Sequence, residues 1–152
     1  MTVIKRTSKK LKSEPPTPEE FLARYPVEIQ RTSDALRELV RQAVPDRIEK
    51  VILGWALIGF RVPVGKSDKH FAFLSPKPEA VYFGFEYGIL IDDPDHLMDG
   101  EELKLKQVRF FTIRRKQDIH TEEVLRWTKE AADLVAMPRD MRLALLQDRA
   151  GW

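Results

Sequence analysis

The sequence of 152 residues contains no cysteine, which excludes disulfides, thiolate metal sites and cysteine nucleophiles. A chain without cysteine suits a reducing compartment, so we expect a cytoplasmic protein. No apolar run approaches the ~20 residues that a membrane helix needs. The opening, MTVIKRTSKK, has basic residues but no apolar segment behind them, and this pattern does not predict a secretory signal.

Motifs of catalysis are also missing. The seven glycines form no phosphate-binding loop, and neither H-E-x-x-H nor G-x-S-x-G occurs. The three histidines, His70, His96 and His120, lie in separate segments. The sequence therefore favours a non-enzymatic protein with no catalytic residue assigned. A site assembled in three dimensions from scattered residues stays an open alternative.

The composition, 43% hydrophobic and 33% charged, is typical of a folded domain. The net charge is +2, but residues 1–16 carry five basic residues against Glu14, a local net of +4, so the remaining residues carry −2. The prolines of SEPPTP prevent a helix there. We predict a disordered basic tail over residues 1–16, a domain over residues 17–137 and a C-terminal extension over residues 138–152. The tail lacks interleaved aromatic residues, so the sequence argues against nucleic acid as a partner.

Helical patterns occur at both ends of the domain, with strand patterns between them. TPEE, from Thr17, is a capping box, and an apolar stripe predicts a helix over residues 27–44. KVILGWALIGFRV is apolar on both of its alternating sets of positions, so it would present apolar side chains on both faces of a strand. This pattern predicts a strand that is covered on both faces or kinked at Gly54. Three more strands follow, the last with a bulge at Gln107, and then two helices. This order predicts an α+β fold, in which an antiparallel sheet of four or more strands packs against N- and C-terminal helices.

Between residues 92 and 102 the chain gathers six carboxylates and a histidine. No EF-hand frame fits, because leucine occupies a ligand position. A looser cation site has the following candidate ligands: Asp92, Asp93, Asp95 and His96. In the favoured alternative, Asp93 and Pro94 start a turn or a short helix, Leu97 and Met98 pack on the core, and Gly100 supplies a left-handed turn. This interpretation needs no bound partner.

Aromatic residues of the strands give a second candidate site. If one sheet face is free of helix, aromatic side chains can line a pocket there, with an arginine to anchor an anion. The pocket candidates are Trp55, Phe60, Tyr82, Phe85 and Arg109. Alternatively these rings pack beneath helices, or form the surface for a protein partner or a homodimer. Phe83, Gly84 and Phe85 are faintly similar to an RNA-stacking signature, but its basic residue is missing, so we assign the rings to the core.

Two segments carry a family resemblance. In PEEFLARYPVEIQRTSDALRELVRQAVPDRIEKVILGW, a short helix, a proline and a long helix lead to a Pro-Asp turn and a Glu-x-x-x-x-Gly strand, Glu49 to Gly54. In the second, an Asp-Pro-Asp turn leads through Leu97 and Gly100 into a strand, and an Asp-Ile step at Asp118 opens a helix. Over about residues 18–135 this resembles the YdhG-like family, a bacterial domain family of unknown function. One branch of that family has a Gly-Lys pair after the turn, where this chain reads EELK.

The resemblance implies a frataxin-type α+β sandwich with helices on one face of an antiparallel sheet. Some members of the family are proposed to be frataxin-like iron chaperones. The resemblance therefore implies a binding domain that handles iron through surface carboxylates. The alternative is a small-ligand or protein-interaction module that uses an aromatic sheet face.

Overall fold

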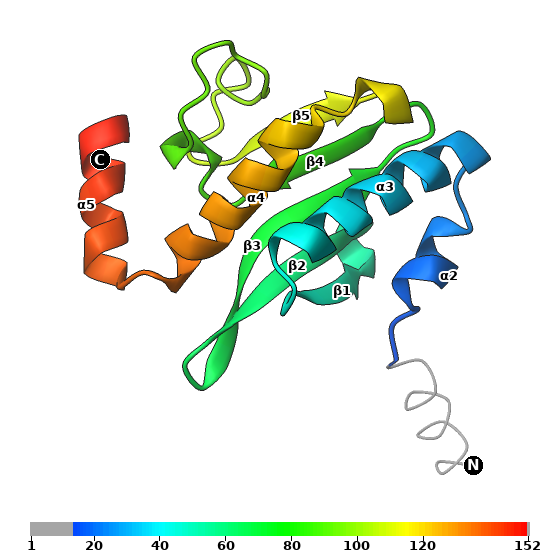
Figure 1. The fold of residues 1–152 in the computed structure, drawn as a ribbon, viewed down its shortest axis with the longest axis horizontal. Helices are drawn as coiled ribbons and strands as arrows, with labels where there is room; N and C mark the ends of the chain where they lie inside the picture. The colour runs from blue at the N-terminus through cyan, green and yellow to red at the C-terminus, as the bar shows by residue number, and fades with distance from the viewer. Residues whose placement is uncertain (1–13, 152) are drawn as a thin grey trace, which may run out of the picture.

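The computed structural model describes residues 14–151 (Figure 1). The α-helices and strands are α2 (Pro18–Leu22), α3 (Val27–Ala43), β1 (Ile48–Ile52), β2 (Leu57–Val64), β3 (Ser67–Pro76), β4 (Val81–Phe85), β5 (Arg109–Ile113), α4 (Thr121–Ala136) and α5 (Arg139–Ala150). Three single-turn 3-10 helices are η1 (Leu53–Trp55), η2 (Gly88–Leu90) and η3 (Lys116–Asp118). Most of the predicted tail, residues 1–13, lies outside the described residues. No helix within residues 14–151 is both long and apolar enough to cross a membrane.

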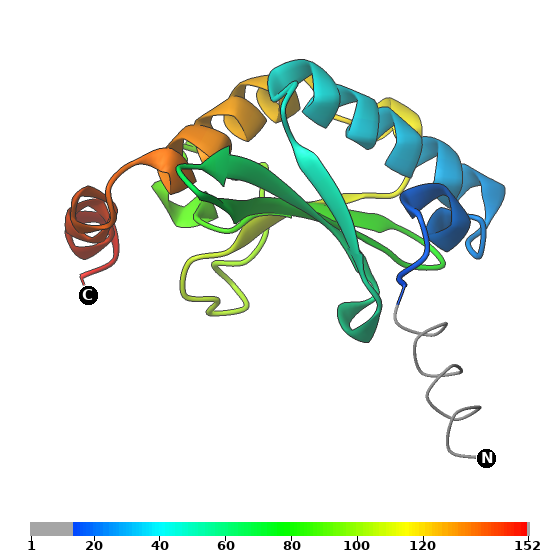
Figure 2. The same cartoon turned by 90° about the horizontal axis from the view of Figure 1, so that it is seen from below.

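The five strands form one antiparallel sheet in the order β1-β2-β3-β4-β5. Each strand pairs with the next along the chain, and the longest connection is the loop of residues 86–108 between β4 and β5. Helices α3 and α4 lie side by side across one face of the sheet (Figure 2). No helix of the described chain covers the other face. The predicted α+β fold, with an antiparallel sheet and helices from both ends of the chain, is confirmed.

The core lies between the sheet and α3 and α4. One row of register partners faces the helices, and each of its side chains is at most 6% exposed. This row consists of Val51, Ile58, Leu74, Phe83 and Phe111. The Phe111 ring continues the core into α4, because it stacks on Trp127 with ring centroids 5.7 Å apart. Aromatic burial of this kind contributes much of a domain's stability.

The N-terminal helices begin at the residues that the sequence predicts, and α3 ends one residue before its predicted end at residue 44. The Glu20 amide donates to the Thr17 hydroxyl at 3.1 Å, and the Thr17 amide donates to the Glu20 carboxylate at 2.9 Å. This pair is the predicted capping box, and Pro18 occupies the first helical position, where no amide donor is needed. Helix α3 ends at Ala43, directly before Val44 and Pro45.

The predicted strand of residues 50–62 is two strands. At Gly54 the chain forms η1, and Ala56 then adopts a left-handed conformation with φ of 52°, so β2 returns antiparallel to β1. The interpretation of a kink at Gly54 is thus confirmed, and the kink is a complete reversal. The predicted bulge at Gln107 is wrong, because β5 begins at Arg109 and pairs with β4 without a register shift. The bulge lies between Phe60 and Arg61.

Helix α5 packs beside η2 at the edge of the fold (Figure 1). Leu146 is 1% exposed, and the Arg142 guanidinium donates to the carbonyl oxygens of Leu134 and Met137 at 3.3 and 3.0 Å. The same guanidinium lies 5.1 Å from the centre of the Tyr87 ring. The C-terminal extension is therefore docked on the domain.

Candidate functional site

The sheet face opposite α3 and α4, called the open face below, carries a row of alternating large side chains and glycines. In register across all five strands, the row consists of Lys50, Gly59, Phe73, Gly84 and Phe110. We call it the central row. It points away from the helices because side chains alternate along a strand and the neighbouring row is the buried one that contains Leu74 and Phe83.

The two glycines of the central row allow rings from neighbouring strands to lie along the sheet. A Cβ atom at Gly84 would lie 2.7 Å from Cζ of Phe73 and 2.6 Å from Cβ of Phe110. A Cβ atom at Gly59 would lie 3.2 Å from both Cδ2 and Nε2 of His70. A side chain at either position would displace these rings. Glycine in a strand interior commonly marks such a close approach.

A second aromatic pair extends this surface. Tyr82 and Phe110 have ring centroids 5.3 Å apart at an interplanar angle of 47°, and the Lys77 ammonium lies 5.9 Å from the centre of the Tyr82 ring. Beside them, the Thr112 hydroxyl donates to the Asp99 carboxylate at 2.6 Å. The open face is thus largely aromatic at its centre, with one polar contact toward the loop.

Exposed apolar side chains stand at two borders of the open face. Trp55 and Leu53, in the turn between β1 and β2, are 71% and 49% exposed. Leu103 and Leu105, in the loop before β5, are 60% and 39% exposed. Figure 2 shows that both segments project from the side of the sheet opposite α3 and α4. Contiguous exposed apolar surface with polar residues around it is typical of an interaction site.

His70 and Glu86 form a polar pair on the open face, with Nδ1 of His70 3.3 Å from Glu86 Oε2. The Gln107 side-chain amide lies 3.5 Å from the other Glu86 oxygen. Nε2 of His70 is buried over Gly59 and has no hydrogen-bond partner among the described residues. A ring held in this way supports the surface, and its Nε2 is not presented to a bound molecule.

The predicted aromatic pocket is not assembled as the sequence suggested. Phe60 and Phe85 have 0% exposure and belong to the helix-facing core, so they cannot contact a ligand. Tyr82 lies on the open face, Trp55 stands at its border, and Arg109 lines a different pocket. The prediction that one sheet face is free of helix holds, but the five candidate residues do not come together.

Phe73 and Phe110 are the open-face residues that sequence reasoning missed. The sequence feature that could have identified them is the pair Gly59 and Gly84. These glycines lie inside strands and pair in register on either side of Phe73. When neighbouring strands are aligned as hairpins, Phe73 lies between the two glycines. The sequence of one strand by itself does not show this.

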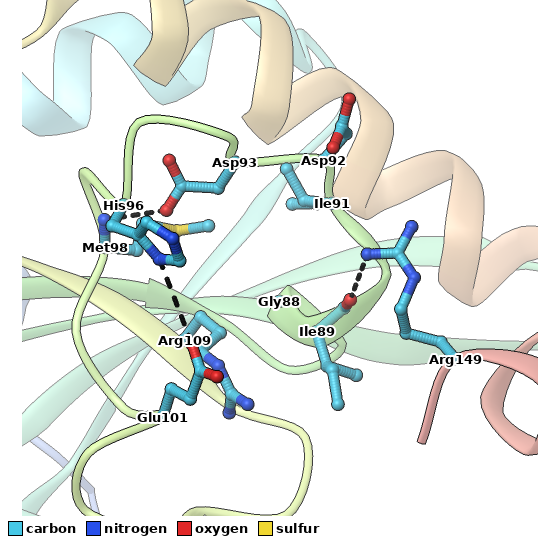
Figure 3. A pocket seen from close by; sticks show the side chains of 10 residues that line it. All are labelled: Gly88, Ile89, Ile91, Asp92, Asp93, His96, Met98, Glu101, Arg109 and Arg149. Carbon is cyan, nitrogen blue, oxygen red and sulfur yellow. Dashed lines mark hydrogen bonds and ion pairs between the residues drawn. The ribbon is translucent and has the colours of Figure 1, made fainter. Parts of the chain in front are cut away.

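A pocket of about 280 Å³ lies between η2, the following loop, the start of β5 and α5 (Figure 3). Its floor is apolar, from Ile89, Ile91 and Met98, and two arginines enter it. Arg149 donates to the Ile89 carbonyl oxygen at 3.1 Å, and Arg109 donates to the Val108 carbonyl oxygen at 2.7 Å. Both guanidinium groups are therefore held by the backbone of the pocket wall.

The acidic turn lies at the rim of this pocket. The two carboxylate oxygens of Asp93 accept from the amides of Leu97 and Met98, at 2.8 and 2.9 Å. Met98 is 6% exposed, and Gly100 has φ of 131°, a conformation that favours glycine. The predicted turn is confirmed in these features.

The four predicted metal ligands do not form one donor set. Asp92, Asp93 and His96 line the pocket in Figure 3, and Nδ1 of His96 lies 3.9 Å from a Glu101 oxygen. A second cleft, against α4, is lined by Asp95 together with Asp92 and Asp93, but not by His96. Within residues 14–151, no three side chains of His, Cys, Asp or Glu are grouped so that they could hold a metal ion.

The cleft beside Asp95 has a volume of about 320 Å³ and is bordered by Glu123, Arg126 and Glu130 of α4. Burial raises the pKa of the Glu130 carboxyl above its usual value, and the nearby carboxylate of Asp92 raises it further. The cleft is thus an acidic region on the side of α4, separate from the open face.

A cleft near α2 is filled by an ion-pair network. Arg37 donates to the Glu49 carboxylate at 2.6 and 3.2 Å and to the Glu19 carboxylate at 2.8 Å. Burial lowers the pKa of Arg37, but the hydrogen bonds to Glu49 and Glu19 outweigh burial and raise the pKa above its usual value. These contacts join α2, α3 and β1, so the cluster has a structural role.

Comparisons of this chain with protein-family models, curated proteins and solved structures found no match. The functional argument therefore depends on the arrangement of the described residues.

Proposed function

We propose that this protein is a non-enzymatic binding module whose ligand docks on the open face of the sheet. The central row carries the argument, because its two glycines leave the rings of Phe73 and Phe110 as a low, continuous surface with no covering helix in the described chain. Sites for organic ligands are mostly apolar and aromatic, with a few polar groups that fix orientation.

Two further observations support the proposal. Trp55 and Leu103 extend the apolar surface at opposite borders, where a docked partner would cover them. Nε2 of His70 is buried and Nδ1 contacts the Glu86 carboxylate, an arrangement that favours a supporting role for this imidazole over a role as a general base.

Iron delivery through Asp92, Asp93, Asp95 and His96 stays a prediction, as does membership of the YdhG-like family. Iron delivery has less support than the open face, because His96 does not line the cleft that the three aspartates share and no three donors within residues 14–151 are grouped to hold a metal ion.

The proposal is tested with anilinonaphthalene sulfonate, a dye that fluoresces on apolar protein surfaces. We expect the folded protein to enhance the dye's fluorescence, and the double variant Phe73→Ala/Phe110→Ala to lose most of that enhancement while its circular dichroism spectrum is unchanged. Val27→Ala is the matched control, because Val27 is 60% exposed on α3, away from the open face. Equal dye fluorescence with the double variant and with the parent protein would contradict the proposal.

A further inference from the structure

We infer that the open face binds single-stranded nucleic acid, with bases stacked on the rings of Phe73, Tyr82 and Phe110 and phosphates contacting Lys50, Lys77 and Arg114. This inference rests on the proposed function and names the ligand class for the same face. Single strands are commonly bound by aromatic side chains that stack on bases, within a groove of basic residues that follows the backbone.

The geometry of the rings is the first step. Because Cζ of Phe73 reaches the position of a Gly84 side chain, the Phe73 side chain leans along the sheet toward β4, where it is partly exposed. Phe110 adjoins the same glycine on β5, and Tyr82 lies 5.3 Å from Phe110. Three rings on three adjacent strands give a platform on which successive bases can stack.

The basic residues are the second step. Lys77 and Arg114 line a hollow of about 270 Å³ together with Tyr82, and Lys50 ends the central row on β1. None of these three cations forms an ion pair within residues 14–151. The hollow contains one carboxylate, Glu79, so positive charge exceeds negative charge within it, and the Asp99 carboxylate beside Phe110 is engaged by the Thr112 hydroxyl.

This combination selects among ligand classes. Duplex nucleic acid keeps its bases stacked within the helix and cannot place them on protein rings. Single strands supply both free base surfaces and a phosphate charge.

The sequence argued against nucleic acid because the basic tail lacks interleaved aromatic residues, and because the RNA-stacking signature compared with Phe83 and Phe85 lacks its basic residue. Both rings are indeed in the core, at 0% exposure. The platform uses the aromatic residues of the opposite face. Burial of Phe83 and Phe85 in the core is therefore compatible with nucleic-acid binding on the open face.

The test measures fluorescence anisotropy of fluorescein-labelled oligothymidine and oligouridine of about 15 nucleotides with the full chain, at several salt concentrations. We expect saturable binding that weakens as salt rises, and weaker binding of a duplex of matched length. Phe73→Ala/Phe110→Ala should weaken binding about tenfold or more without changing the slope of log Kd against log salt.

Charge variants give an independent readout that does not depend on the aromatic variants folding. Lys77→Gln/Arg114→Gln should reduce the magnitude of the salt slope by about 1.4, since each phosphate contact on a single strand contributes about 0.7. Lys129→Gln, on the exposed side of α4, is the control for lost charge and should leave Kd unchanged. Lys9→Gln/Lys10→Gln tests the basic N-terminal segment.

Three outcomes overturn the inference. The first is no oligonucleotide binding by a protein that still binds the dye at the open face, which leaves the proposed function intact. The second is binding that survives the open-face variants and disappears with Lys9→Gln/Lys10→Gln. The third is duplex binding as strong as single-strand binding. If the dye also fails to bind, the proposed function falls as well.

Discussion

Asp93 fixes the turn after η2 through its side chain. Its two carboxylate oxygens accept from the amides of Leu97 and Met98, so one residue satisfies two backbone donors in a loop without regular structure. Because both oxygens of its carboxylate are engaged in this way, the main role of Asp93 is to hold the turn. A cation bound there would compete with these two amides for the same oxygens.

We expect Asp93→Ala to lower the free energy of unfolding by about 1–2 kcal/mol, because two amides lose their acceptor. Urea unfolding measures this change. Asp95→Ala is the control, since Asp95 is exposed and its side chain has no hydrogen bond within the described residues. Equal stability of the two variants would show that the Asp93 contacts do not hold the turn.

Local residue chemistry explains why these positions were predictable. The Thr17–Glu20 capping box and the Asp93 turn each depend on side chains within five residues of the backbone groups they satisfy. The faces of Phe60 and Tyr82 were not predictable in the same way, because the face depends on strand register over longer distances. Between Phe60 and Arg61 the pairing skips Phe71, so the bulge lies in β3, where Phe71 and Ala72 are both buried and the alternation of faces is interrupted.

At the scale of elements, β1 and β2 show how the fold accommodates a segment that is apolar at the positions of both strand faces. The run from residue 50 to residue 62 is too apolar for one half-covered strand, and η1 divides it so that each strand places one side on the core. The apolar residues of η1 then have no core to enter, which is why Leu53 and Trp55 are exposed at the border of the open face. The candidate site thus depends on a chain reversal that the sequence showed only as a kink.

Helix α5 is an element with one small docking surface. Leu146 and Arg142 contact the domain, whereas Met141, Leu143 and Leu145 are 39–56% exposed. Elements with few buried contacts open locally, below the free energy of global unfolding. Because Arg149 of α5 also enters the pocket in Figure 3, opening of the helix would remove one wall of that pocket.

We expect Leu146→Ala to speed amide hydrogen exchange in α5 by about 30-fold or more, since a buried leucine truncated to alanine loses about 2–3 kcal/mol at a site that can partly collapse. Exchange in β3 and β4 should be unchanged. Leu145→Ala is the matched control, as Leu145 is 43% exposed in the same helix turn. A parallel increase of exchange in α5 and in the sheet would place α5 within the global unfolding unit instead.

At the scale of the whole molecule, two hollows differ in charge. Asp92, Asp95, Glu123 and Glu130 surround the cleft beside α4 with one arginine, Arg126, whereas Lys77 and Arg114 line the hollow beside Tyr82 with one carboxylate, Glu79. An anionic ligand is therefore favoured in the hollow beside Tyr82 over the cleft beside α4. The net charge of the chain conceals this separation, because the sequence alone does not say which charges share a side.

The acidic cleft predicts how stability depends on pH. Burial raises the pKa of Glu130, Asp92 and Asp133 raise it further, and Arg126 and Arg149 lower it. The folded state therefore holds this proton more tightly than the unfolded chain, in which the group titrates near 4.5. The stability due to the proton is present below that pH and is lost as pH rises through the folded pKa.

We expect Glu130→Gln to raise the free energy of unfolding at about pH 7, where the wild-type carboxylate is charged in a half-buried site, and to leave it unchanged at about pH 3, where Glu130 is protonated in both states. Urea unfolding across this range measures the difference. Glu79→Gln removes the same charge from an exposed turn beside the open face, so it controls for the change in net charge. If Glu130→Gln stabilised the protein equally at both pH values, the gain would come from packing of the amide, and the cleft would not disfavour the charged carboxylate.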